Sequence, residues 1–145
     1  MEKDLGNYRK SYEKEALEES KISDNPIQQF QTWFYEVEAS ETVDEANAMS
    51  ISSIGLDGFP KTRVVLLKKY YEEGFVFYTN YDSEKGRAIS AHPQVCLSFF
   101  WPSMERQVII KGLAEKLPAA VSDNYFDSRP LGSRLGAMVS PQSEV

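Results

Sequence analysis

The sequence predicts a mainly β fold with peripheral helices, in which short antiparallel strands curl into a barrel. Segments of strand length, either alternating or continuously apolar, follow one another closely from residue 48 onward. Turn signals built from Gly, Pro, Asn and Asp separate them. The 145 residues, 41% of them hydrophobic, suffice for one domain with a buried core. Such a sheet usually removes its edges by closing on itself.

The N-terminal segment and the first helix differ sharply in composition. Residues 1–25 are mostly charged and polar, which predicts a mobile N-terminal arm or a short exposed helix. Asn25 and Pro26 then supply a capping side chain and a proline at the first helical position. The apolar residues that follow at helical spacing are Ile27, Phe30, Phe34 and Val37. We expect this helix to end near Ala39 and the globular domain to span 26–145.

A three-stranded meander is predicted next. Residues 48–54 alternate, with Met49, Ile51 and Ser53 on one face. The segment 62–70 is β-branched and apolar, and 75–79 returns after the turn at Glu72-Glu73-Gly74. The three segments are close enough to pair as neighbours.

The second half alternates between helix and strand signals. Ser83 is expected to cap a short helix that ends before His92-Pro93, because a residue preceding proline avoids the α region. Strands are predicted at 95–100 and 106–115. Pro118 is expected to open a further helix that runs through Tyr125 and Phe126.

Composition excludes several classes of function. A net charge of −6 and a pI near 4.9 argue against nucleic-acid binding, which depends on Lys and Arg. The N-terminus lacks the apolar stretch of a signal peptide, so we expect a cytoplasmic protein. Cys96 is the single cysteine and lies in an apolar run, which predicts a buried thiol and excludes both an intramolecular disulfide and a thiolate metal cluster. His92 precedes a proline with no metal-ligand spacing around it, so no metal site is predicted.

Basic side chains gather beside predicted strand ends and helix starts. The clusters are Arg63 with Lys68 and Lys69, Lys85 with Arg87, and Arg129 with Arg134. In an acidic protein such clusters suit a phosphorylated ligand, because Arg grips phosphate with two N–H groups and Lys acts as a point charge. The alternative is that they are solvated surface charges.

Several of these positions can be examined more closely. Arg63 opens an apolar run, so we expect it on a half-buried strand where it needs an anionic partner. Strand alternation puts Lys68 on the opposite face unless a bulge intervenes. Residues 83–85 offer a hydroxyl, an ammonium and free N–H groups at a helix start, which suits an anion, the alternative being an ordinary cap. A helix continued past 126 would align Tyr125, Arg129 and Ser133 on one face.

Five motifs, in order, resemble the pyridoxine/pyridoxamine 5'-phosphate oxidase family. They are Arg63-Val64-Val65-Leu66-Leu67-Lys68, Phe77-Tyr78-Thr79-Asn80, Glu105-Arg106-Gln107-Val108, Tyr125-Phe126-Asp127-Ser128-Arg129-Pro130 and Ser140-Pro141-Gln142-Ser143. The resemblance implies a split β-barrel of the FMN-binding type and a homodimer with flavin at the subunit interface. It also implies oxidation of pyridoxamine or pyridoxine 5'-phosphate to pyridoxal 5'-phosphate, with oxygen as acceptor and hydrogen peroxide as product.

The same resemblance assigns residues position by position. The FMN-binding set would be Arg63, Val64, Val65, Leu66, Tyr78, Thr79, Lys85, Gln107, Gln142 and Ser143. Within it, Arg63 and Lys85 would hold the phosphate. The substrate-binding set would be Arg9, Tyr12, Lys68, Tyr125, Arg129 and Ser133, with the arm folding over the substrate.

Two departures from the family pattern stand out. Glu84 occupies a position beside Lys85 that is usually basic. The family also continues with further strands that carry a Trp and an Arg-x-His motif, which this sequence does not match, so we expect a barrel that lacks its C-terminal strands and has an open edge. The alternative function is a flavin- or pyridoxal-phosphate-binding barrel without oxidase activity.

Overall fold

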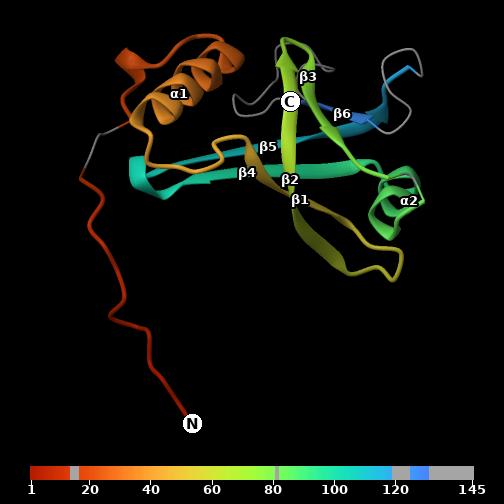
Figure 1. Ribbon diagram of the computed structural model, residues 1–145, viewed down its shortest axis with the longest axis horizontal. Coiled ribbons are helices and arrows are strands. Elements are labelled where there is room, and N and C mark those ends of the chain that lie inside the picture. The colour runs from red at the N-terminus through yellow and green to blue at the C-terminus, as the bar shows by residue number, and fades with distance from the viewer. Residues whose placement is uncertain (14–16, 81, 119–124, 131–145) are drawn as a thin grey trace.

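The computed structural model describes residues 1–13, 17–80, 82–118 and 125–130, with the side chains of 125 and 130 excepted. In this part of the chain, six antiparallel strands form a closed barrel in the order β1-β2-β3-β6-β5-β4 (Figure 1). The strands are β1 (Ala48–Ile54), β2 (Pro60–Tyr71), β3 (Gly74–Tyr78), β4 (Gln94–Trp101), β5 (Arg106–Lys116) and β6 (Tyr125–Pro130). The predicted mainly β barrel and its first meander are confirmed.

Closure of the barrel corrects one expectation. Strand β1 pairs with β2 on one side and with β4 on the other, where Ser50, Ile51 and Ser52 face Ser98, Leu97 and Cys96. We expected an open edge, but among the described strands each has a partner on both sides. The backbone hydrogen-bonding groups therefore find partners within the barrel itself.

Strand β6 corrects a second expectation, that of a helix running from Pro118 through Phe126. From Tyr125 onward the chain is extended and pairs with both β3 and β5. Phe126 is 2% exposed and Asp127 and Ser128 are fully buried, so this segment completes the barrel wall. Pairing on two sides outweighs the local helix signal, as tertiary context often does. Residues 119–124 lie outside the described part.

Helix α1 (Pro26–Ser40) covers one end of the barrel (Figure 1). The side chain of Asn25 caps it by accepting hydrogen bonds from the N–H groups of Ile27 and Gln28, as predicted. Phe30 lies at the centre of an aromatic cluster, with its ring centroid 5.1 Å from those of Tyr70 and Phe99. This packing holds the helix on the core through its apolar face.

Helix α2 (Glu84–Ala91) follows β3 and lies beside β1. Ser83 caps it as predicted, because the Ser83 Oγ accepts from the Gly86 N–H at 3.0 Å. Two short 3-10 helices complete the regular structure of the described residues, η1 (Glu19–Lys21) and η2 (Pro102–Met104). None of the helices in the described ranges is long and apolar enough to cross a bilayer.

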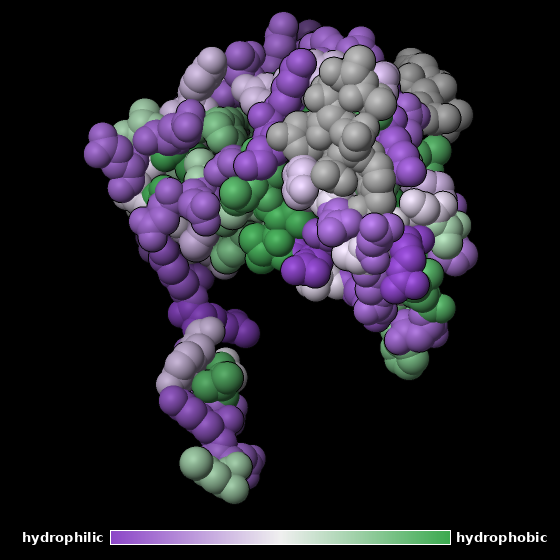
Figure 2. Space-filling view, turned by 45° about the vertical axis from the view of Figure 1, so that its right-hand side comes forward, coloured by the Kyte–Doolittle hydropathy of each residue, from purple (hydrophilic) through white to green (hydrophobic). Residues whose placement is uncertain are grey.

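Residues 1–13 of the N-terminal arm are exposed and contain no helix or strand, and the first of them reach away from the barrel (Figures 1 and 2). Within the described residues, an ion pair connects the arm to the domain, with Lys10 Nζ 3.2 Å from Glu105 Oε2 beside η2. The mobility predicted for residues 1–25 stays a prediction.

Cys96 is half-buried, so the prediction of a core thiol is wrong. Its neighbours Val95 and Leu97 face the core, and alternation along β4 turns Cys96 to the outer face. Partial burial still raises the pKa of the thiol, which disfavours the reactive thiolate.

Candidate functional site

The strongest candidate site is a cavity of about 220 Å³ between β1, β2 and the first turn of α2. Among the described residues, three cationic side chains line it, Lys61, Arg63 and Lys85, together with one carboxylate, Glu84. Its remaining wall is small or uncharged and consists of Ile51, Ser53, Thr62 and Ala88. An excess of positive charge in a concave, partly apolar setting suits an anionic ligand.

The register of the first hairpin positions two of the three cations. Ile51 pairs with Arg63 and Ser53 pairs with Lys61, so both basic residues share a face with the buried side chains of β1. Strand β2 begins at Pro60 and becomes buried only from Val65, which leaves Arg63 exposed at the barrel's end. Arg63 therefore lies on a half-buried strand, as expected, but its own side chain is exposed. Its role as a partner of an anion stays a prediction.

Helix α2 contributes the third cation. Ser83 fixes the start of the helix, and Lys85, half-buried, follows in its first turn. Burial lowers the pKa of Lys85, and the nearby Arg63 guanidinium lowers it further. Two like charges held together in this way would both gain from an anion between them.

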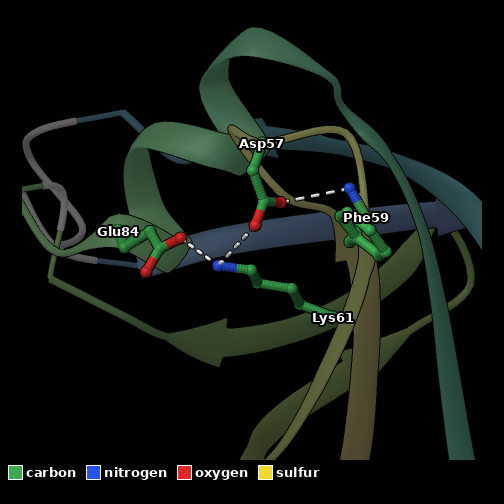
Figure 3. Close-up of polar contacts among 4 residues, drawn as sticks. All are labelled: Asp57, Phe59, Lys61 and Glu84. Atoms are coloured by element: carbon green, nitrogen blue, oxygen red, sulfur yellow. Dashed lines mark hydrogen bonds and ion pairs between the residues drawn. The ribbon is translucent and has the colours of Figure 1, made fainter.

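Glu84 and Lys61 form an ion pair at the rim of the cavity, drawn in Figure 3. Lys61 Nζ also lies 3.9 Å from Asp57 Oδ2 in the β1–β2 turn. The hydrogen bond with Glu84 is the main cause that raises the pKa of Lys61. Sequence reasoning missed Lys61, Thr62 and Ser53 as site residues. The predicted β-hairpin could have indicated them, because pairing between its two strands places residues 61–63 opposite residues 51–53.

Other residues of the predicted flavin set lie outside this lining. Val65 belongs to the core, whereas Val64 is 67% exposed on the outer face. The further positions in the described ranges are Leu66, half-buried on β2, Tyr78 and Thr79 at the end of β3, and Gln107 on β5. Gln107 lines a different cavity between α1 and β5, with Trp33 and Ile109. Gln142 and Ser143 fall outside the described residues.

The predicted substrate residues are dispersed in the same way. Lys68 sits at a β-bulge, since Leu67 pairs with Phe77 while Lys69 pairs with the adjacent Val76. Strand alternation placed Lys68 on the face opposite Arg63 unless a bulge intervened, and the structure has that bulge. Lys68 nevertheless does not line the cavity. Arg9 and Tyr12 lie in the exposed arm. Tyr125 begins β6 with only its backbone described, and Ser133 lies outside the described residues.

Arg129 belongs to a second charged cluster, on β6. Its guanidinium lies 3.0 Å from Glu115 Oε1 and 3.1 Å from Asp127 Oδ2. The Tyr71 hydroxyl donates a hydrogen bond to the same Asp127 oxygen. Burial raises the pKa of Asp127 although Tyr71 and Arg129 oppose the shift, and the pKa of Tyr71 rises to about 12. The carboxylates here already neutralise the guanidinium.

Comparison with known proteins agrees with this fold. The structure of PhzG from Burkholderia lata matches with a TM-score of 0.66 at 22% identity, over 70% of this chain and 50% of that one. A pyridoxamine 5'-phosphate oxidase-related, FMN binding protein from Nostoc punctiforme matches with a TM-score of 0.54 at 18% identity, over 65% of this chain and 48% of that one. The barrel is thus a split β-barrel of the FMN-binding type.

Sequence similarity is much closer. Residues 36–145 match the family described as "Pyridoxamine 5'-phosphate oxidase". The relative called pyridoxine/pyridoxamine 5'-phosphate oxidase from Flavobacterium johnsoniae is 67% identical over 98% of this chain and 66% of its own length. Its namesake from Flavobacterium psychrophilum is 64% identical over 99% of this chain and 67% of its own length. The chain therefore belongs to the pyridoxamine 5'-phosphate oxidase family, and it spans about two thirds of the length of these curated relatives.

Proposed function

We propose that this protein uses FMN to oxidise pyridoxamine 5'-phosphate or pyridoxine 5'-phosphate to pyridoxal 5'-phosphate. Oxygen is the acceptor in this proposal and hydrogen peroxide the second product. The main support is that Arg63 of β2 and Lys85 of α2 line the same cavity. The chain is also 67% identical to a relative called pyridoxine/pyridoxamine 5'-phosphate oxidase.

The residues of the cavity fit the phosphate end of FMN. A phosphate monoester carries close to two negative charges at neutral pH and offers several acceptor oxygens. Arg63 supplies a bidentate donor and Lys85 a point charge, and the start of α2 adds backbone N–H groups. An anion bound there would also relieve the repulsion that lowers the pKa of Lys85.

When bound, FMN supplies the redox chemistry, accepting a hydride equivalent from the substrate and passing electrons to oxygen. The chain's own contribution is to fix two phosphorylated molecules relative to each other, which lowers the entropic part of the barrier. Arg63 and Lys85 hold the cofactor's phosphate in this proposal. Lys68, Tyr125, Arg129 and Ser133 bind the substrate, and Arg9 and Tyr12 cover it.

The proposal includes a cytoplasmic homodimer. Its support is an outer sheet face on which Val64, Ser50, Ser98 and Ile109 are successive cross-strand neighbours. Val64 is 67% exposed, Ile109 42%, and Phe100 on the same strand as Ser98 is 59% exposed. A face of exposed apolar side chains separated by serines suits contact with another protein surface. A particle of twice the chain mass in light scattering would agree, and a monomer at micromolar concentration would refute this part.

The decisive assay uses the purified full chain with FMN and saturating pyridoxamine 5'-phosphate. We expect stoichiometric peroxide and aldehyde, with the yellow flavin bleached when oxygen is excluded. Bound flavin that yields neither product would contradict oxidase activity.

A second candidate is a barrel that binds flavin or pyridoxal phosphate without oxidising anything. The observation that favours it is the dispersal of the substrate set, in which Arg129 is paired with Glu115 and Asp127 while Lys68 lies outside the cavity. It predicts tight flavin binding and no anaerobic bleaching by substrate, so the same experiment separates the two.

A further inference from the structure

The proposed phosphate cavity contains a negatively charged side chain, Glu84, which would disfavour the binding of a phosphate. Among its lining residues that the structure describes, Glu84 is the one carboxylate, and its side chain is 51% exposed. An unpaired carboxylate there would repel an incoming phosphate and so offset part of the attraction that Arg63 and Lys85 exert on it. Glu84 is not unpaired, because Lys61 reaches it from β2.

Lys61 is held in this position by the hairpin as well as by Glu84. Asp57 approaches its ammonium from the turn, and the Asp57 side chain itself accepts a hydrogen bond from the Phe59 N–H at 3.1 Å (Figure 3). The lysine stem passes so close to Gly55 that a Cβ added there would lie 2.8 Å from Lys61 Cε. The turn therefore leaves room for Lys61 and supplies a second carboxylate that keeps it at the rim.

Stability does not account for this pair. Both side chains are largely exposed, at 41% for Lys61 and 51% for Glu84. Exposed ion pairs contribute little to folding, because water screens them and ordering two long side chains costs entropy. Their location counts for more, since charges at a concave site act on a ligand across a short distance.

We propose that Lys61 is a positioning residue of the cofactor site, one that neutralises Glu84 and so lets the cavity accept a phosphate. This inference rests on the proposed function and extends it to a residue outside the set that the resemblance implied. The described lining residues carry two net positive charges with Lys61 and one without it. Loss of Lys61 therefore removes a cation and exposes the repulsion of Glu84 at the same time.

The test is a fluorescence titration of the full chain with FMN and, in parallel, with riboflavin, which lacks the phosphate. Lys61→Met should weaken FMN binding about ten-fold and leave riboflavin binding unchanged. Lys61→Met with Glu84→Gln should recover most of the lost affinity, because the repulsive charge is then gone. Lys61→Arg should bind FMN like the unaltered protein.

Lys21→Met is the matched control. Lys21 forms an exposed pair with Glu18, with 3.3 Å between Nζ and Oε2, and it lies outside the cavity. It should bind FMN normally. An unchanged FMN affinity in Lys61→Met, an equal loss for riboflavin, or no recovery in the double variant would each overturn the proposal. Circular dichroism is used to check that every variant is folded.

The proposed function is tested separately, by measuring whether the unaltered protein binds flavin and inorganic phosphate. If that protein binds inorganic phosphate but no flavin, the oxidase proposal falls, and the same variants titrated with phosphate decide the role of Lys61. If it binds neither probe, both proposals are overturned.

Discussion

Two charged clusters in this barrel use the same residue types to opposite effect. The rim cavity between the first hairpin and α2 gathers three cations around one carboxylate and opens to solvent. The β6 cluster combines one guanidinium with two carboxylates and a tyrosine hydroxyl around the fully buried Asp127. The first has positive charge in excess, whereas in the second the one positive charge already has carboxylate partners within the protein.

The difference separates a cavity that would accept an anion from a contact in which the guanidinium is already paired. Buried charges persist only when partners inside the protein replace water, as Tyr71 and Arg129 do for Asp127. Arg63 and Lys85 are near each other, and burial together with mutual repulsion lowers the pKa of Lys85. An anionic ligand would supply the missing partner at the rim, so changes there should affect binding, and changes at Asp127 should affect stability.

The largest effect is expected for Asp127→Ala. The substitution leaves a cavity in the barrel wall, deprives the Tyr71 hydroxyl of its acceptor and removes one of the two carboxylates beside Arg129. We expect a loss of about 3 kcal/mol in the free energy of unfolding, the range for breaking a buried charged contact. Urea denaturation followed by circular dichroism measures it. Asp127→Asn, which keeps the shape and an acceptor, should cost much less, and equal losses would contradict the argument.

Arg63→Ala should show the reverse pattern. Removing a charged donor from the phosphate should weaken FMN binding by about 1.5 to 3 kcal/mol, or roughly ten-fold to over a hundred-fold. Stability should hardly change, because Arg63 is exposed. Arg87→Ala is the control, since Arg87 is an exposed arginine on α2 outside the cavity lining. An unchanged dissociation constant in the folded Arg63 variant would remove Arg63 from the site.

Most of the local structure could be predicted from the sequence, because its signals are local. Asn25 and Ser83 were identifiable as helix caps from residue type and position. The alternation of Met49, Ile51 and Ser53 matches their burial on β1. Arg63 and Lys85 were assigned to one phosphate site only through the family resemblance, since 22 positions separate them along the chain.

Features that depend on contacts between distant segments were not predictable in this way. Strand β6 is extended because β3 and β5 pair with it, and Pro118 signals nothing of those partners. Lys61 could be recognised as a lining residue of the cavity only from the structure, because the strand register places it opposite Ser53 and near α2. The outward turn of Cys96 likewise follows from which face of β4 meets the core, which an uninterrupted apolar run does not reveal.

The pH dependence of stability sharpens the comparison further, with a smaller effect. Burial raises the pKa of Asp127 above its ordinary 3.8, so just above that pH the folded state binds more protons than the unfolded state. Stability contributed by this group therefore falls as pH rises through the raised pKa, the reverse of an exposed, paired aspartate. The free energy of unfolding should be measured from pH 4 to pH 7 for the unaltered protein and for Asp127→Asn. As pH rises, the unaltered protein should lose stability relative to the variant. A shift in the opposite direction would mean that Arg129 and Tyr71 outweigh burial.

The smallest effect is expected at the two helix caps, and it tests whether the rim is specialised for binding. Ser83→Ala removes the acceptor for the Gly86 N–H and the hydroxyl that donates to the Asn80 carbonyl. Asn25→Ala removes the equivalent cap from α1, at the other helix of the barrel. Each should lower the free energy of unfolding by about 1 kcal/mol. Only Ser83→Ala should also weaken FMN binding, because a frayed first turn displaces Lys85 and the backbone N–H groups that face the phosphate. Thermal unfolding and flavin titration of the two variants give the comparison. Equal flavin affinities in both would show that the start of α2 serves the fold alone, and that Arg63 and Lys61 carry the site without it.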